Sequence, residues 1–246
     1  MKSKDLLIHL HMPKTGGTTL KKVLKKNYPK DKSFDVYEAQ SDLDSKLKAI
    51  ASKNPALIQG HLPFGIHSYF PSNCTYITLL RDPVNRVISE YYFIRSIPWH
   101  EQYHMVKNLS LDEFQQLPQK QNIQTHLILG NHRKGHIQNK EIEMAKEILK
   151  NYFAVVGITE MFNESLFLMA KKFGWKNTHY KKANITKNKP SIDQIPFTTI
   201  EAIRENNQMD IEIYECGKQL LFDEIQALSI LEKKQMKLLG KNNSAM

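Results

Sequence analysis

The segment from residue 5 to residue 20 constrains this chain most, because a short apolar run leads through a glycine turn into a helical pattern. Residues 6–10 are apolar enough to predict a buried strand. At Gly16 and Gly17 the backbone can approach a bound group closely, and the N–H groups that open the following helix attract anions. Lys14 adds a full positive charge. The segment therefore predicts a phosphate-binding loop between a strand and a helix.

The position of the lysine separates this loop from that of the common nucleoside triphosphatases. Their loop, Gly-x-x-x-x-Gly-Lys-Ser/Thr, carries its lysine after the last glycine, whereas Lys14 precedes both glycines here. Thr18 and Thr19 follow the glycines and add hydroxyl donors. The plain alternative is a glycine-rich turn whose lysine is merely solvated, and the loop alone leaves that alternative open.

Composition limits the class of protein and its partners. With 246 residues, 41% of them hydrophobic and 24% charged, the chain suits a soluble globular protein with a large core. Its formal net charge of +10 favours anionic partners. Cys74 and Cys216 are too few to indicate a disulfide framework or a zinc site, and no acidic cluster suggests magnesium. No stretch reaches a membrane-spanning length, so we expect a cytoplasmic protein without a metal.

Three further apolar runs predict strands, at residues 56–61, 76–80 and 152–158. Strands that alternate with helices form parallel sheets with right-handed crossovers. We therefore expect an α/β fold, with a central parallel sheet of about four to five strands flanked by helices around a P-loop-like nucleotide-binding core. The main helical patterns cover residues 41–53, 82–95, 141–150, 162–173 and 209–239.

A second anion signature lies at residues 80–92, where a predicted strand ends and a helix begins. Residues 82 and 83, Asp and Pro, are a typical helix start. Arg81 stands at the strand end, the edge where open α/β sheets bind ligands. Helical spacing places Ser89 on one face with Arg86, away from the apolar stripe. Arg81 and Ser89 are thus predicted to hold a phosphate, the alternative being an arginine that pairs with a nearby carboxylate.

Together, Pro-Lys-Thr-Gly-Gly-Thr-Thr and Arg-Asp-Pro-Val-x-Arg-x-x-Ser-x-Tyr-Tyr resemble the paired cofactor motifs of Golgi carbohydrate sulfotransferases, which use 3′-phosphoadenosine 5′-phosphosulfate (PAPS). The resemblance is closest to the heparan sulfate 2-O- and 6-O-sulfotransferase group and its bacterial relatives. It continues weakly at residues 122–125 and 155–160, and at Asp210 with Tyr214. The chain departs from the Golgi enzymes in its missing N-terminal anchor and paired cysteines, which points to a soluble, bacterial-type member.

The resemblance implies a single sulfotransferase domain over residues 1–246 that moves a sulfuryl group from PAPS to an acceptor hydroxyl, with a glycan or polysaccharide as acceptor. The product nucleotide is 3′-phosphoadenosine 5′-phosphate (PAP). In such a transfer the protein positions the partners and stabilises charge, and Lys14 suits the leaving oxygen. By resemblance, Arg81 and Ser89 hold the 3′-phosphate. The 5′-phosphosulfate falls to the matching loop residues, Lys14, Thr15, Gly16, Gly17, Thr18 and Thr19.

The acceptor hydroxyl must lose its proton, which calls for a base that is neutral near pH 7. His61 is the best placed of the ten histidines, because it ends the strand at residues 56–61 on the edge that carries both motifs. The family places its catalytic histidine at a similar Gly-His step. The other candidates are His67, then His11 and His9, and the carboxylates Glu90 and Glu101.

Two other functions stay open at the level of sequence. A nucleotide-dependent kinase also uses a phosphate loop on a parallel sheet, although the position of the lysine speaks against it. A basic nucleic-acid binder has the right charge, but no nucleic-acid-binding motif is visible, so we expect no nucleic-acid partner. The acceptor is expected near the basic residues 181–189 or the aromatic residues after the second motif.

Overall fold

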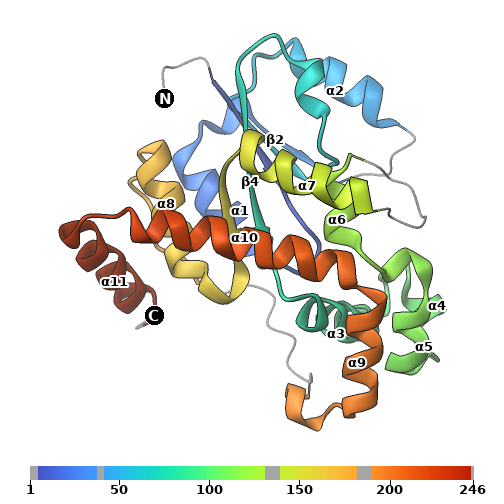
Figure 1. Cartoon of the computed structure of the whole chain (residues 1–246). Helices are drawn as coiled ribbons and strands as arrows, with labels where there is room; N and C mark the ends of the chain where they lie inside the picture. The colour runs from blue at the N-terminus through green and yellow to red at the C-terminus, as the bar shows by residue number, and fades with distance from the viewer. Residues whose placement is uncertain (1–4, 38–41, 131–138, 182–189, 245–246) are drawn as a thin grey trace.

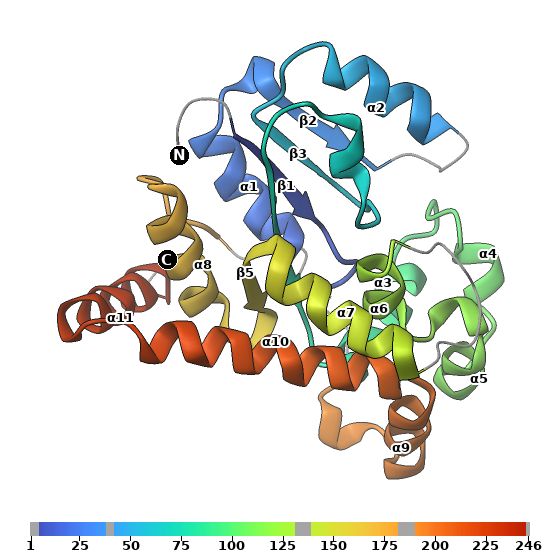
Figure 2. The ribbon, with the colours of Figure 1, turned by 45° about the horizontal axis from the view of Figure 1, so that its top comes forward.

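The computed structural model describes residues 5–37, 42–130, 139–181 and 190–244. At its centre lies a parallel five-stranded sheet in the order β2-β3-β1-β4-β5 (Figures 1 and 2). This confirms the α/β fold with a central parallel sheet that the sequence predicts. The strands are β1 (Leu6–Leu10), β2 (Ser33–Val36), β3 (Leu57–Gly60), β4 (Cys74–Leu80) and β5 (Phe153–Ile158).

Strand β1 is the axis of the sheet, and all five of its residues are buried. It pairs with β3 on one side and β4 on the other, so that Leu10 lies beside both Gly60 and Thr78. Sequence analysis does not predict β2, which pairs with β3 at the edge. That strand has four residues, of which only Phe34 and Val36 are apolar, because an edge strand needs little burial.

The α-helices surround the sheet, and α3, α4, α5, α6 and α9 gather beyond the carboxyl ends of its strands (Figures 1 and 2). The helical stretch predicted at 209–239 forms two helices, because Ser229 and Glu232 make a capping box that starts the second one. The helices are α1 (Gly17–Asn27), α2 (Leu43–Ala51), α3 (Pro83–Arg95), α4 (Tyr103–Val106), α5 (Leu111–Gln116), α6 (Ile123–Ile128), α7 (Asn139–Tyr152), α8 (Phe162–Phe173), α9 (Phe197–Asn206), α10 (Gln208–Gln226) and α11 (Ile230–Ser244).

Two apolar clusters hold these layers together. The larger one packs the sheet against its helices, while a smaller one joins α3 to α5 and α9 through Val87, Phe114 and Ile203. The smaller cluster holds α3 at the carboxyl edge of the sheet. Since α3 carries most of the second motif, residues 80–92, this packing places the motif at that edge. Over the described ranges, no helix has both the length and the apolar composition to cross a bilayer.

Candidate active site

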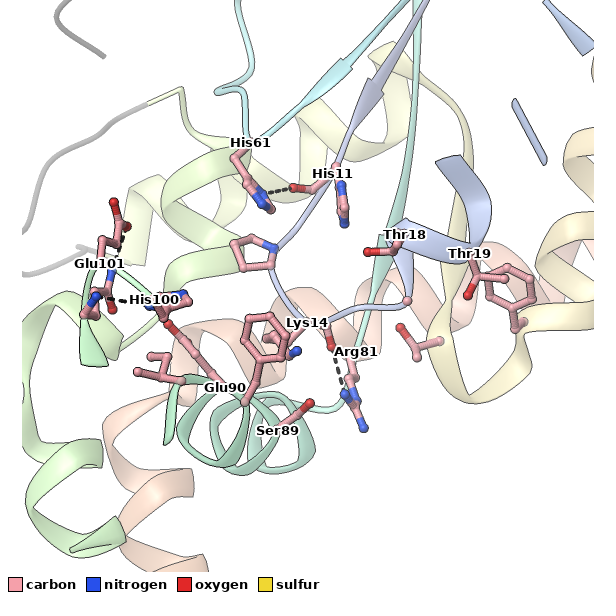
Figure 3. Close-up of a pocket in the computed structure, with 18 of the residues that line it drawn as sticks. His11, Lys14, Thr18, Thr19, His61, Arg81, Ser89, Glu90, His100 and Glu101 are labelled. Atoms are coloured by element: carbon pink, nitrogen blue, oxygen red, sulfur yellow. Dashed lines mark hydrogen bonds between the residues drawn. The ribbon is translucent and has the colours of Figure 1, made fainter. Parts of the chain in front are cut away.

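A cleft of about 570 Å³ opens at the carboxyl edge of the sheet. Residues that directly follow four strands line it: His11 after β1, His61 after β3, Arg81 after β4 and Thr159 after β5. In open α/β sheets the carboxyl edge at a reversal of strand order is the usual place for a ligand. The fold thus brings both sequence motifs and the predicted base into one cleft (Figure 3).

The loop between β1 and α1 wraps one side of this cleft. Gly16 adopts a left-handed φ of 81° and Lys14 one of 66°, and the turn leads directly into α1. Gly17 has no room for a side chain, since an added Cβ would lie 2.0 Å from Cδ2 of His11. Lys14 places its ammonium 3.4 Å from the centroid of the Phe93 ring. Thr18 and Thr19 line the cleft beside these residues.

Thr15 is the one predicted loop residue whose side chain turns away from the cleft. It is fully buried, and its hydroxyl donates to the backbone oxygen of Met12 at 2.9 Å. Its own backbone oxygen lies 2.6 Å from the hydroxyl of Thr159. The side chain of Thr15 therefore braces the loop.

Arg81 faces the loop from the end of β4. Its Nη1 donates to the backbone oxygen of Lys14 at 2.8 Å. Its Nε is buried without a hydrogen-bond partner among the described residues, and the Glu160 carboxylate lies 3.8 Å from it. Burial lowers the pKa of Arg81, while the charges of Glu160 and Asp82 oppose this shift. Arg81 lines the cleft, and a guanidinium there can donate to a phosphate oxygen.

The backbone of Arg81 is fixed by Gln124, at the start of α6. Gln124 accepts from the Arg81 N–H at 2.9 Å and donates to the Arg81 oxygen at 3.0 Å. Asp210 of α10 in turn accepts from the backbone N–H of Gln124 at 3.2 Å and of Thr125 at 2.8 Å. Two of the weaker matches of the sequence analysis, residues 122–125 and Asp210, are thus in contact with each other and support Arg81.

Ser89 lines the cleft from α3, but Arg86 does not stay on its open face. Arg86 is fully buried, donating to Glu90 at 2.8 Å and to the backbone oxygen of Lys120 at 2.9 Å, with its Nε 4.0 Å from Asp210. The predicted placement of Arg86 away from the apolar stripe is therefore wrong, because carboxylates from α3 and α10 neutralise its charge inside the protein.

His61 is held with one ring nitrogen committed. Its Nδ1 lies 2.8 Å from the backbone oxygen of His11 and must donate to it, which leaves the lone pair on Nε2. Desolvation lowers the pKa of His61, while the hydrogen bond to His11 and the charge of Glu90 oppose the shift. The imidazole is therefore neutral near pH 7, the state that a general base requires.

The other candidate bases differ in their access to the cleft. His67 lies outside it, with Nδ1 3.0 Å from the Tyr76 hydroxyl and its ring stacked on Tyr152. Glu90 lines the cleft, but ion pairs occupy its carboxylate; burial alone would raise its pKa, and Arg86 and Lys120 lower it instead. Glu101 is exposed at the rim.

Sequence reasoning gave no role to several residues in or beside the cleft. Thr159 lines the cleft and Glu160 pairs with Arg81; both directly follow the predicted strand at residues 152–158, and the resemblance covered them without giving them a role. Tyr37 follows β2, which was not predicted, and its hydroxyl lies 2.8 Å from Nδ1 of His11. His100 lines the cleft from the segment after α3, next to the exposed Trp99.

Two further expectations concern the basic segment near the acceptor and the absence of a metal, and the described residues cover each only in part. Residues 182–189, most of the basic segment expected near the acceptor, lie outside the described residues. Within the described ranges, His, Cys, Asp and Glu side chains form no group of three or more that could hold a metal ion.

The chain was compared with known proteins. The family model described as "Sulfotransferase family" matches residues 1–216. Heparan-sulfate 6-O-sulfotransferase 1 of Cricetulus griseus is 24% identical, over 96% of this chain and 72% of the relative. Heparan-sulfate 6-O-sulfotransferase 1-B of Danio rerio is also 24% identical, over 97% and 71%. The crystal structure of mouse sulfotransferase SULT7A1 complexed with PAP covers 98% of this chain and 84% of its own, at 13% identity and a TM-score of 0.40.

The expectation of a cytoplasmic protein is wrong on this comparison. The matched curated proteins are heparan-sulfate 6-O-sulfotransferases, which are enzymes of the Golgi lumen. The expectation rested on a low cysteine count and on apolar stretches too short to span a membrane, and neither feature is specific to one compartment.

Proposed function

The chain belongs to the sulfotransferase family, and we propose that its cleft transfers a sulfuryl group from PAPS to a carbohydrate hydroxyl with His61 as the base. One observation carries the proposal: the phosphate loop and Arg81 share one cleft, where Arg81 Nη1 lies 2.8 Å from the oxygen of Lys14. Family membership removes the reason for a kinase or a nucleic-acid binder.

Different elements of the fold bind the two ends of the nucleotide. The 5′-phosphosulfate lies against the start of α1, where Gly16, Gly17, Thr18 and Thr19 line the cleft. The 3′-phosphate lies against Arg81 and Ser89, and the proposal is supported by the fact that both residues line the cleft and carry donors suited to a phosphate. The left-handed turn at Gly16 is what lets the backbone close around the phosphate.

In the transfer, the acceptor oxygen forms a bond to sulfur while the bond from sulfur to the bridging phosphate oxygen breaks. Negative charge grows on that leaving oxygen, and the Lys14 ammonium stabilises it. Nε2 of His61 takes the proton of the acceptor hydroxyl, since its Nδ1 is committed to the backbone of His11. PAP leaves with the charge on its 5′-phosphate.

The acceptor binds on the side of the cleft opposite Thr18 and Thr19. In Figure 3, Thr18 and Thr19 lie on one side of the view, His100 and Glu101 on the other, and His61 between them. Gln102 anchors this second wall, because its oxygen accepts from the buried Lys120 at 2.6 Å. The heparan-sulfate sulfotransferases among the relatives support a polysaccharide in this position.

A transfer assay tests the proposal. The full chain is incubated with PAPS that carries labelled sulfur, together with heparan sulfate, other polysaccharides, glycolipids and small alcohols. We expect label on a polysaccharide and release of an equal amount of PAP. Label on none of the acceptors, or label on small alcohols alone, would contradict the carbohydrate assignment.

Matched variants test the assigned residues. Lys14→Ala is expected to lose roughly 100-fold or more in turnover, because one stabilising donor contributes about that much, whereas Lys22→Ala on the exposed side of α1 stays at the wild-type rate. His61→Gln is expected to lose turnover while PAP binding persists, and His67→Gln serves as its control because His67 lies outside the cleft.

A further inference from the structure

A second histidine stands beside the proposed base. His11 directly follows β1 and lines the cleft, with its ring centroid 4.8 Å from that of His61. The residue is only 6% exposed. In Figure 3 the two rings extend from neighbouring strand ends toward the phosphate loop. The proposed mechanism uses the backbone oxygen of His11 and leaves its imidazole without a role.

Tyr37 commits one nitrogen of this imidazole. The Tyr37 hydroxyl lies 2.8 Å from Nδ1 of His11, and burial raises the pKa of Tyr37, so the phenol keeps its proton. The structure gives this hydroxyl no other hydrogen-bond partner among the described residues. Nδ1 is thus the one acceptor within reach of this O–H among the described residues, and when the phenol donates to it, the imidazole carries its hydrogen on Nε2.

The opposite edge of the ring faces the start of α1. A Cβ added to Gly17 would lie 2.3 Å from Nε2 of His11, so this nitrogen lies against the first residue of the helix. Nδ1 has its partner in Tyr37. Nε2 has no hydrogen-bond partner among the described residues, and it is not fully buried, so a ligand can reach it. An anion held by the first N–H groups of α1 therefore lies next to the Nε2–H donor.

The surroundings keep this imidazole neutral. Burial lowers the pKa of His11 to about 2, and nearby His9, His61, Lys21 and Lys14 add to the shift. A neutral imidazole beside a helix start can donate a hydrogen bond without giving up its proton, as histidine does in other enzymes that polarise an oxygen.

We propose that His11 is a second catalytic histidine, whose Nε2–H donates a hydrogen bond to an oxygen of the sulfuryl group during transfer, and that Tyr37 is the positioning residue that fixes its tautomer. The inference rests on the proposed function. The bonds exchanged are unchanged: sulfur gains the acceptor oxygen and loses the bridging oxygen, His61 takes the proton, and His11 keeps its own.

The tautomer is measured first, on the full chain without nucleotide. Imidazole ¹⁵N shifts are recorded by NMR, and the His11 signals are assigned by their loss in His11→Phe. We expect a neutral Nε2–H tautomer that persists from pH 7 to pH 5, and its loss in Tyr37→Phe. An Nδ1–H tautomer, or protonation near the ordinary histidine pKa of about 6.5, would overturn the proposal.

Kinetics with PAP binding then locate the contact. PAP lacks the sulfuryl group, so His11→Phe should bind PAP within roughly threefold of wild type while its turnover falls roughly 100-fold. His11→Gln, which places an amide N–H near the position of Nε2, should recover part of that loss. Turnover of His11→Phe near the wild-type rate, or an equal loss of PAP binding, would overturn the assignment.

Tyr37→Phe tests the same proposal without a substitution at His11, in case substitutions at His11 disturb folding. It retains the ring that packs edge-on against His11 and His61 and removes only the hydroxyl. We expect turnover to fall by about tenfold, the value of one hydrogen bond, with PAP binding kept; unchanged turnover contradicts the role of Tyr37. Absence of PAP binding to wild-type protein would instead refute the proposed function, a separate outcome from the NMR result.

Discussion

Arg81 donates a hydrogen bond from Nη1 to the backbone oxygen of Lys14 across 2.8 Å, between residues that are 67 positions apart in the sequence. The contact ties the end of β4 to the turn that follows β1. It joins the two motifs that are predicted to bind anions. Preorganised charge of this kind needs no rearrangement at the moment of reaction.

Gln124→Ala is expected to weaken PAP binding by roughly tenfold, although Gln124 lines no part of the cleft. In the variant, the backbone N–H and backbone oxygen of Arg81 both lose their hydrogen bonds to the Gln124 amide. Leaving such groups unpaired costs about 1 to 3 kcal/mol, so Arg81 is held less firmly. Calorimetric titration of PAP measures the effect, with the exposed Gln116→Ala as control. Equal affinity of the two variants would show that Arg81 does not depend on this support.

The pH dependence of turnover reports the protonation of His61. Desolvation lowers its pKa below the ordinary value of about 6.5, and only the neutral imidazole can take a proton. Turnover should therefore stay level through pH 7 and fall on the acid side of pH 6.5. The profile of kcat at saturating PAPS measures this. If the residual activity of His61→Gln shows the same fall at acid pH as the wild type, a group other than His61 causes that fall.

Sequence reasoning found the parts of the site that follow strongly apolar strands. His61 and Arg81 were located because β3 and β4 are visible as apolar runs and parallel strands share a carboxyl edge. Tyr37 was missed because it follows β2, whose single edge pairing demands little apolar character.

Long-range partners were beyond the reach of local patterns. Helical spacing places Arg86 on the face of α3 away from the apolar stripe, yet Asp210 from α10 lies 4.0 Å from its Nε inside the protein. Helical periodicity reports neighbours three and four residues away and carries no information on a carboxylate from a distant helix. The support of Arg81 by Gln124 was hidden for the same reason.

The buried His9 makes stability depend on pH. Burial lowers its pKa to about 4, whereas an unfolded chain has a value of about 6.5. Between about pH 6.5 and pH 4 the unfolded state therefore binds a proton at this residue that the folded state does not. Over that range His9 lowers the free energy of unfolding by about 1.4 kcal/mol for each unit of falling pH.

His9→Leu should reduce the pH dependence of the free energy of unfolding between pH 6.5 and pH 5 by the contribution of this one residue. The substitution removes a ring whose Nε2 has no partner among the described residues, and Gln59 keeps its hydrogen bond to Asp35 at 2.9 Å. Urea unfolding at several pH values measures the free energies. Identical slopes in the variant and the wild type would mean that His9 is not the neutral buried group described here.

Calorimetric titration with PAP and with adenosine 5′-phosphosulfate, on wild type, Lys14→Ala and Arg81→Gln, tests most directly whether one nucleotide spans both motifs. The predicted result is one PAP per chain, weaker in both variants by roughly tenfold or more. Arg81→Gln should weaken the binding of adenosine 5′-phosphosulfate, which has no 3′-phosphate, much less than that of PAP. Wild-type protein that binds no PAP, or an Arg81→Gln variant that loses both ligands equally, would contradict the account.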